Sequence, residues 1–320
     1  MNEIIKEAYT VGALLYSPAI NTNISYSIKN EIFGKKYSLC LCLEDSISDD
    51  AVEIGEKNIA NIFSTLQKEF SENNFYMPKI FIRVRNPLQI SKIFHMVKNN
   101  SNFLTGFVLP KFSLENADIY ISEILKINEV SKNKIYIMPI IENGLILDIE
   151  KRPNFLYKIK EKLDTIHNLV LNIRVGGNDI CHNLSLRRNC FHTIYDISSI
   201  NNILGDIYSV FGKEYVISGV VWDYFSGNDD QWKNGLEKEL ELDILNGFIG
   251  TTAIHPNQVP VINNSLKVSK TDYEDAKSIL NWDNSQNKMV AKSTASERMN
   301  EIKTHSNWAK KIIELGNFYG

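Results

Sequence analysis

The sequence predicts an α/β protein whose fold class is a (β/α)8 TIM barrel with a C-terminal helical extension. Eight strand-like segments can be counted, and helical periodicity separates most of them. The length of 320 residues is close to that of one such barrel with an appendage. No glycine-rich dinucleotide fingerprint follows the first strand, which weakens the alternative of an open doubly wound sheet. We therefore expect a barrel domain over residues 1–265 and helices over residues 266–320.

The first half of the expected barrel consists of apolar runs that end in polar residues or proline. Pro87 should stop the third strand, because proline cannot donate to a central ladder. Helical periodicity follows the second, third and fourth strands at 51–70, 88–100 and 113–128. The four strands themselves are expected at 11–19, 37–45, 79–87 and 105–111.

The second half contains two runs rich in β-branched residues, which are typical of strands buried on both faces in a parallel sheet. Pro153 should start or kink the helix that joins them, since it cannot continue a helix interior. The strands are expected at 134–144, 168–179, 214–223 and 247–256, and the helices at 145–164, 193–211 and 231–245. A polar loop is expected at 181–189, and the extension should contain helices at 269–282 and 293–316 joined by a linker at 283–288.

Composition excludes several classes of partner. The net charge is −3 and the sequence pI about 6.1, so no nucleic acid and no anionic membrane is expected to bind. No apolar run approaches the ~20 residues of a bilayer span. The first residues are partly acidic, unlike a signal peptide. We expect a cytoplasmic protein without a membrane partner.

Cysteine and histidine suggest only a weak alternative, a zinc site. The four cysteines are too few and too unevenly placed for a disulfide framework. Two cysteine–histidine pairs lie close together, but their spacing fits a structural zinc site poorly. These residues are Cys181, His182, Cys190 and His192.

Two carboxylates carry the functional prediction. Glu142 follows the fifth expected strand and Asp179 follows the sixth. In a (β/α)8 barrel, the residues at the carboxyl ends of the strands form the active site. Two neighbouring carboxylates offer hard oxygen ligands suited to Mg²⁺. The alternative is that they cap the following helices, for which Asp179 is a suitable type.

Six short motifs follow one another along the chain: Glu44-Asp45, Arg83-Val-Arg85-Asn86-Pro87, Leu109-Pro110-Lys111, Ile141-Glu142, Gly177-Asn178-Asp179 and Gly247 to Gln258. Together they resemble the citrate lyase beta subunit and related hydroxy-acid aldolases of the HpcH/HpaI aldolase family. The likeness covers roughly residues 11 to 280. Three further segments are Leu186-Arg187-Arg188, Thr193-Ile-Tyr195-Asp196 and Ser218-Gly-Val-Val-Trp222. They resemble a branch found near tellurite-resistance genes and described as a carbon–carbon bond lyase of the TIM-barrel fold.

The resemblance implies a Mg²⁺ enzyme whose metal ligands are Glu142 and Asp179. It also implies that an arginine of the third strand binds the substrate carboxylate; Arg83 is preferred, and Arg85 projects to the same side of a strand. Alternatively, Arg83 forms an ion pair with Glu44 or Asp45, and both roles are compatible. The predicted catalytic residues are Arg83, Glu44 and Asp45, and the predicted substrate contacts are Arg83, Arg85, Lys111, Gly177, Asn178, Arg187 and Arg188.

Some of these assignments have open alternatives. Lys111 could equally be a solvent-exposed lysine. Arg187 and Arg188 could equally form a subunit contact, and the resemblance implies a homo-oligomer, usually a trimer or hexamer. Thr251 replaces a lysine of the family motif, which makes a coenzyme A thioester substrate doubtful.

We therefore expect a Mg²⁺-dependent carbon–carbon bond lyase that acts on a small carboxylate-bearing substrate through an enolate. Mg²⁺ would lower the barrier as a Lewis acid, and an arginine fork would fix the carboxylate. One alternative is another Mg²⁺-enolate barrel enzyme of the phosphoenolpyruvate or pyruvate type. A second is a non-catalytic barrel subunit. Carboxyl groups of Glu142 and Asp179 that do not face one cavity would contradict the lyase prediction.

Overall fold

The computed structural model describes residues 3–282 and 289–320, and it confirms the predicted barrel. Eight parallel strands are ordered β7-β6-β5-β4-β3-β2-β1-β8. Two backbone hydrogen bonds join the remaining edges, from Gly219 N to Gly250 O at 2.9 Å and from Ile249 N to Ile217 O at 2.8 Å. The strands are β1 (Ala13–Pro18), β2 (Tyr37–Cys42), β3 (Lys79–Arg83), β4 (Leu104–Leu109), β5 (Tyr136–Ile141), β6 (Ile173–Val175), β7 (Ile217–Ser218) and β8 (Thr251–Ala253).

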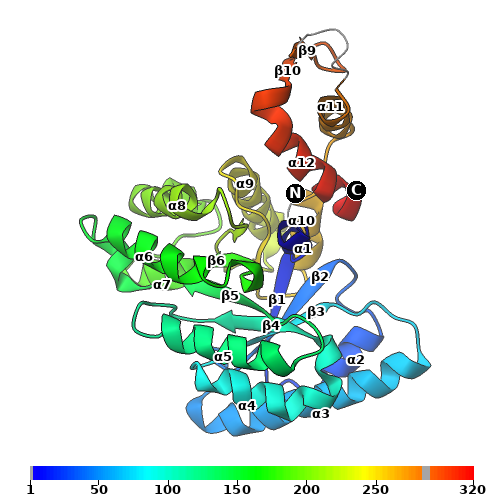
Figure 1. Ribbon diagram of the computed structural model, residues 1–320, viewed down its shortest axis with the longest axis vertical. Coiled ribbons are helices and arrows are strands. Elements are labelled where there is room, and N and C mark those ends of the chain that lie inside the picture. The colour runs from blue at the N-terminus through cyan, green and yellow to red at the C-terminus, as the bar shows by residue number, and fades with distance from the viewer. Residues whose placement is uncertain (1–2, 283–288) are drawn as a thin grey trace.

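Helices surround the strands on the outside of the barrel (Figure 1). The expected helices between strands are all present, although several begin later than the sequence indicated. Four short helices were not expected, α1, α2, α7 and α10, and α7 replaces part of the predicted polar loop. The helices are α1 (Glu3–Tyr9), α2 (Ile24–Lys29), α3 (Val52–Glu72), α4 (Leu88–Val97), α5 (Ala117–Val130), α6 (Arg152–Asp164), α7 (Gly177–Asn183), α8 (Ser198–Phe211), α9 (Gln231–Leu245) and α10 (Gln258–Ser265).

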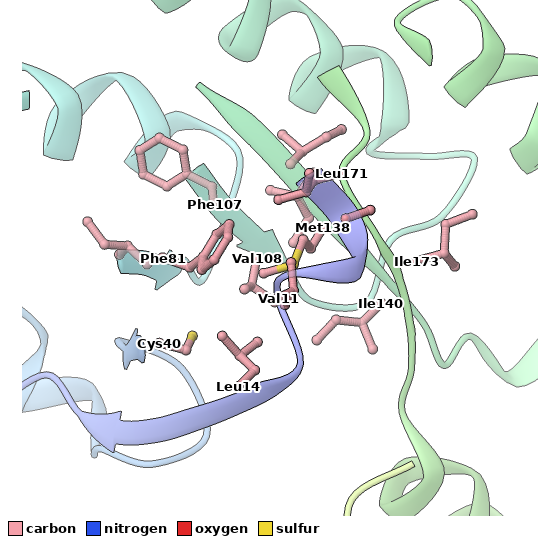
Figure 2. Packing of buried hydrophobic residues seen from close by; sticks show 14 of the residues in the cluster. Val11, Leu14, Cys40, Phe81, Phe107, Val108, Met138, Ile140, Leu171 and Ile173 are labelled. Atoms are coloured by element: carbon pink, nitrogen blue, oxygen red, sulfur yellow. The ribbon is translucent and has the colours of Figure 1, made fainter. Parts of the chain in front are cut away.

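The barrel interior is apolar on one side and polar on the other. Figure 2 shows apolar side chains such as Leu14, Phe81 and Met138 between the strands. Across the interior, Ser218 donates a hydrogen bond to Asn172 at 2.9 Å, and both residues are fully buried. The polar side is formed by strands β6, β7 and β8, whose regular stretches are only three, two and three residues long. This asymmetry leaves polar groups below one side of the barrel mouth.

The C-terminal segment extends away from the barrel (Figure 1). It contains α11 (Lys270–Leu280), the antiparallel strands β9 (Val290–Lys292) and β10 (Met299–Glu301), and α12 (Ile302–Tyr319). The prediction of one helix from residue 293 was therefore wrong, because a strand precedes α12. The expected linker at 283–288 lies outside the described residues. Tyr319 ties the end of α12 to the barrel by donating to the carbonyl of Tyr9 at 3.0 Å.

In the part of the chain that the structure describes, no helix combines the length and the apolar character needed to cross a membrane.

Candidate active site

A cavity of about 220 Å³ opens at the carboxyl ends of the strands. Its wall combines residues from β1, β3, β6, β8 and the segments that follow β2, β5 and β6. This is the end of a (β/α)8 barrel at which chemistry takes place. The polar and charged residues that line it are Tyr16, Asp45, Arg83, Glu142, Arg174, Asn178, Asp179 and Thr252.

Glu142 and Asp179 both line this cavity, so the structure brings the two predicted metal ligands together. Glu142 follows β5 directly and is buried, whereas Asp179 lies in the first turn of α7. The Glu142 carboxylate accepts the backbone N–H of Lys111 at 2.7 Å. Lys111 adopts a left-handed backbone conformation with φ 49°, which belongs to the turn that presents this amide. Glu142 is thereby held in one orientation at the cavity wall.

The electrostatics of this pair favour a bound cation. Burial and, to a smaller extent, the Asp179 carboxylate raise the pKa of Glu142 to about 8, although Arg83 opposes both. Two carboxylates that line one small cavity repel each other unless a positive charge lies between them. Among the described residues there is no cluster of three or more potential ligands. A Mg²⁺ ion here would therefore take two protein oxygens and complete its shell with water and substrate, as that ion commonly does.

Arg83 ends β3 and belongs to a charged cluster at the cavity. Its Nη2 lies 2.6 Å from Glu44 and 3.0 Å from Asp45, so the ion pair considered from the sequence is present. The Nε of Arg83 is buried without a hydrogen-bond partner in the described chain. The Nζ of Lys111 reaches the other oxygen of Glu44 at 2.8 Å. Glu44 thus orients the guanidinium while part of it still faces the cavity.

Glycine lets the chain pass close to these carboxylates. A Cβ at Gly176 would collide with the Glu142 carboxylate, and one at Gly177 would collide with Val220. Gly177 and Asn178 line the cavity as predicted substrate contacts, and Asn178 donates to Asp223 at 2.9 Å. The Gly-Gly pair therefore serves the close approach of α7 to Glu142.

The structure places Arg85 and Arg188 away from the cavity. Regular strand structure ends at Arg83, so the alternation that would point Arg85 inward no longer holds. Arg85 instead donates to the carbonyls of Leu43 and Ile47, at 2.5 and 2.7 Å, and pairs with Asp49. It holds the loop after β2 in place.

Arg188 is buried and held by protein contacts. Its Nη2 lies 2.8 Å from Glu239 and 2.6 Å from the carbonyl of Val221, and its guanidinium stacks 5.1 Å from the Trp222 ring. Its neighbour Arg187 is exposed, and both arginines line a second hollow of about 460 Å³ that also includes Asn178 and Asp223. The zinc alternative gains no support, because the described residues contain no cysteine–histidine cluster able to hold a metal.

Sequence reasoning missed three polar residues that line the cavity, Tyr16, Arg174 and Thr252. Tyr16 lies below the Arg83 guanidinium, 6.0 Å from it. Arg174 lies on β6 and donates to Thr252 at 2.7 Å. The available signal was the polar alternation of Asn172 and Arg174 in an otherwise apolar strand, which places both toward the interior.

Solved structures with this fold include citrate lyase proteins. A citrate lyase from Burkholderia xenovorans LB400 has a TM-score of 0.72 at 10% identity, covering 96% of this chain and 91% of its own. The CitE protein of Mycobacterium tuberculosis in complex with magnesium, acetoacetate and coenzyme A has a TM-score of 0.58 at 13% identity, covering 96% and 98%. The citrate lyase beta subunit of M. tuberculosis with oxaloacetate and magnesium has a TM-score of 0.51 at 14% identity, covering 80% and 98%. At these identities the likeness shows the shared fold.

No curated protein matches this chain. A family model described as "C-C_Bond_Lyase of the TIM-Barrel fold" matches residues 5–320, which is nearly the whole chain. The matched residues include the barrel, the carboxylate pair and the C-terminal segment. The chain therefore belongs to the carbon–carbon bond lyases of the TIM-barrel fold.

Proposed function

We propose that this protein is a Mg²⁺-dependent lyase that makes or breaks a carbon–carbon bond in a small carboxylate-bearing substrate. The observation that supports this most directly is that Glu142, Asp179 and Arg83 face one small cavity at the mouth of the barrel. Cleavage beside a carbonyl or carboxylate leaves an enolate, and the negative charge of that enolate dominates the barrier. When bound, Mg²⁺ would act as a Lewis acid that stabilises this charge.

The chain's own residues bind and orient the substrate. Arg83 lines the cavity and would bind the substrate carboxylate with the guanidinium donors that Glu44 and Asp45 leave free. Glu44 fixes the guanidinium, and Lys111 fixes Glu44 from the other side at 2.8 Å. The backbone N–H of Lys111 holds Glu142 in position. Catalysis therefore depends on a pre-organised charged wall, which needs little rearrangement during the reaction.

A small free acid fits the cavity better than a coenzyme A thioester. Two M. tuberculosis neighbours were solved with magnesium and either oxaloacetate or acetoacetate, and one of these also with coenzyme A. In this chain Thr251 is buried and donates to the carbonyl of Val220 at 2.6 Å, so it offers no cation to an anionic tail. A volume of about 220 Å³ suits a compact acid. We therefore propose a small carboxylate as the substrate.

Metal binding tests the proposal directly. Glu142→Gln and Asp179→Asn should each abolish Mg²⁺ binding in isothermal titration calorimetry while the circular dichroism spectrum stays unchanged. Glu115→Gln, which removes an exposed carboxylate beyond β4, is the control and should bind Mg²⁺ like the unaltered protein. Unaltered Mg²⁺ affinity in Glu142→Gln or Asp179→Asn would contradict the assignment.

Product analysis separates the remaining alternatives. Chromatography of mixtures with Mg²⁺ and candidate 2-oxo acids should show an acid that has lost or gained carbons. Release of inorganic phosphate when phosphoenolpyruvate is added to the same mixtures would favour a phosphoenolpyruvate-type enzyme. Absence of Mg²⁺ binding would favour a non-catalytic barrel subunit. The cytoplasmic location and the homo-oligomer remain predictions, and light scattering would measure the latter.

A further inference from the structure

Arg174 is a buried cation without an anionic partner. Only 2% of the residue is exposed, and its side chain projects from β6 into the barrel interior. Its guanidinium donates to Thr252 Oγ1 at 2.7 Å and lies 3.3 Å from Ser218 Oγ and 3.5 Å from Asn172 Oδ1. All three partners are neutral. No ion pair joins Arg174 to any carboxylate of the described chain.

The other buried arginines show how unusual this is. Four arginines are buried in residues 3–282 and 289–320. Arg83 pairs with Glu44 at 2.6 Å, Arg152 with Asp206 at 2.7 Å and Arg188 with Glu239 at 2.8 Å. An arginine stays protonated in proteins, and burying its charge without a counter-ion costs free energy. Among the buried arginines of the described residues, Arg174 alone lacks a carboxylate partner, and it lies at the cavity.

Register places Arg174 deeper in the barrel than the carboxylate pair. Arg174 is level with Ile140 in the β5–β6 pairing, and Glu142 lies two residues farther toward the mouth. Two residues of strand correspond to about 7 Å. The cavity therefore has carboxylates at its mouth and a cation near its floor. An elongated ligand spanning that depth would present one end to each.

We propose that Arg174 binds a second anionic group of the substrate, so that the substrate is a short dicarboxylate. The first carboxylate would lie at the mouth with Arg83, and the second would reach down to Arg174. This inference rests on the proposed function for the position of the first carboxylate. Thr252, Ser218 and Asn172 position the guanidinium through neutral contacts, which leaves its charge available to the ligand.

Two four-carbon acids that differ in one carboxylate test the assignment. Malate and 2-hydroxybutyrate, each as separate enantiomers, share the 2-hydroxy carboxylate, and only malate has the second acid group. Calorimetric titration of the full chain should give at least about tenfold tighter binding of one malate enantiomer than of either 2-hydroxybutyrate. Absence of this preference in the unaltered protein would overturn the proposal.

Substitutions test whether Arg174 causes the preference for malate over 2-hydroxybutyrate. Arg174→Gln should bind both acids within about threefold of each other and leave 2-hydroxybutyrate affinity unchanged, whereas a merely structural role would weaken both acids equally. Arg187→Gln removes an exposed arginine outside the cavity and should keep the preference. Thr252→Val, which keeps the charge but removes its 2.7 Å contact, should reduce the preference in part. A preference that persists in Arg174→Gln would also overturn the proposal.

Titrations with and without Mg²⁺ distinguish a failure of this inference from a failure of the proposed function. If Mg²⁺ fails to bind but malate preference persists and depends on Arg174, the lyase proposal fails and the anion site stands. If Mg²⁺ binds to Glu142 and Asp179 but malate is not preferred, the anion site alone fails.

Discussion

Two buried arginine–glutamate pairs lie near the mouth of this barrel, and they differ in what surrounds them. Arg83 lines the cavity and pairs with Glu44, and the neighbouring Asp45 and Lys111 are 55% and 59% exposed at the side chain. Arg188 and Glu239 are each 2% exposed at the side chain. The guanidinium of Arg188 stacks on the Trp222 ring, and Arg188 borders the second hollow instead of the cavity. The first pair adjoins the carboxylate cavity, and the second lies outside it.

This difference shows that an ion pair does not by itself reveal its role. Both arginines bind a carboxylate, and both lie in segments that follow or end barrel strands. The Nε atoms of both arginines are buried without a hydrogen-bond partner in the described chain. Arg83 lines the cavity that also contains Glu142, whereas Arg188 does not. Access to the cavity therefore distinguishes Arg83, which we propose to bind substrate, from Arg188, which stabilises packing.

Removing the buried Arg188 should have the largest effect on stability. Arg188→Met leaves Glu239 buried without its counter-charge, so the free energy of unfolding should fall by about 3 kcal/mol. Urea denaturation measures this, and Mg²⁺ affinity of the folded fraction should not change. Arg187→Met is the matched control, because an exposed neighbour should cost less than about 0.5 kcal/mol. A loss below about 1 kcal/mol for Arg188→Met would show that the pair contributes little.

Crowding the cavity should have the next largest effect, and on metal binding. A methyl group at Gly176 would displace the Glu142 carboxylate, so Gly176→Ala should weaken Mg²⁺ binding by about 10–100-fold in calorimetry. Gly144→Ala is the control, since a Cβ there meets nothing within 4 Å. Equal Mg²⁺ affinity in the two variants would exclude the close approach as a determinant of the site.

The smallest predicted effect is a pH dependence of stability in the network around Arg188. Burial raises the pKa of Asp243 to about 7, against the opposing effects of Tyr195 and Arg188. The unfolded aspartate titrates near about 3.9, so the folded protein holds a proton that the unfolded chain has lost. The free energy of unfolding should therefore fall as pH rises through 7, by about 1 kcal/mol between roughly pH 6 and pH 8.

Asp243→Asn tests this dependence. The asparagine cannot titrate but can still accept the Tyr195 hydroxyl, which bonds Asp243 at 2.7 Å. Its free energy of unfolding should change less with pH over the same range, as measured by urea denaturation. Parallel curves for the two proteins would assign the pH dependence to other groups.

The sequence by itself determined the barrel and the place of the carboxylate pair. Apolar runs separated by helical periodicity specify the strands, because a buried parallel strand must be apolar on both faces. Glu142 and Asp179 could be placed because each follows such a run, and the carboxyl ends of parallel strands meet at one end of a barrel. The apolar runs, the helical periodicity and the carboxylates that follow the runs can all be read from short stretches of the sequence.

Only the tertiary structure decided which arginines reach the cavity. Arg85 lies past the end of β3 and Arg188 lies in a loop, so their directions follow from packing and not from strand alternation. Arg174 could be placed inside the barrel from the alternation of β6, but its lack of a carboxylate depends on which side chains the other strands bring near it. Whether a buried arginine has a carboxylate partner depends on the closed barrel, because the neighbouring side chains come from distant parts of the chain.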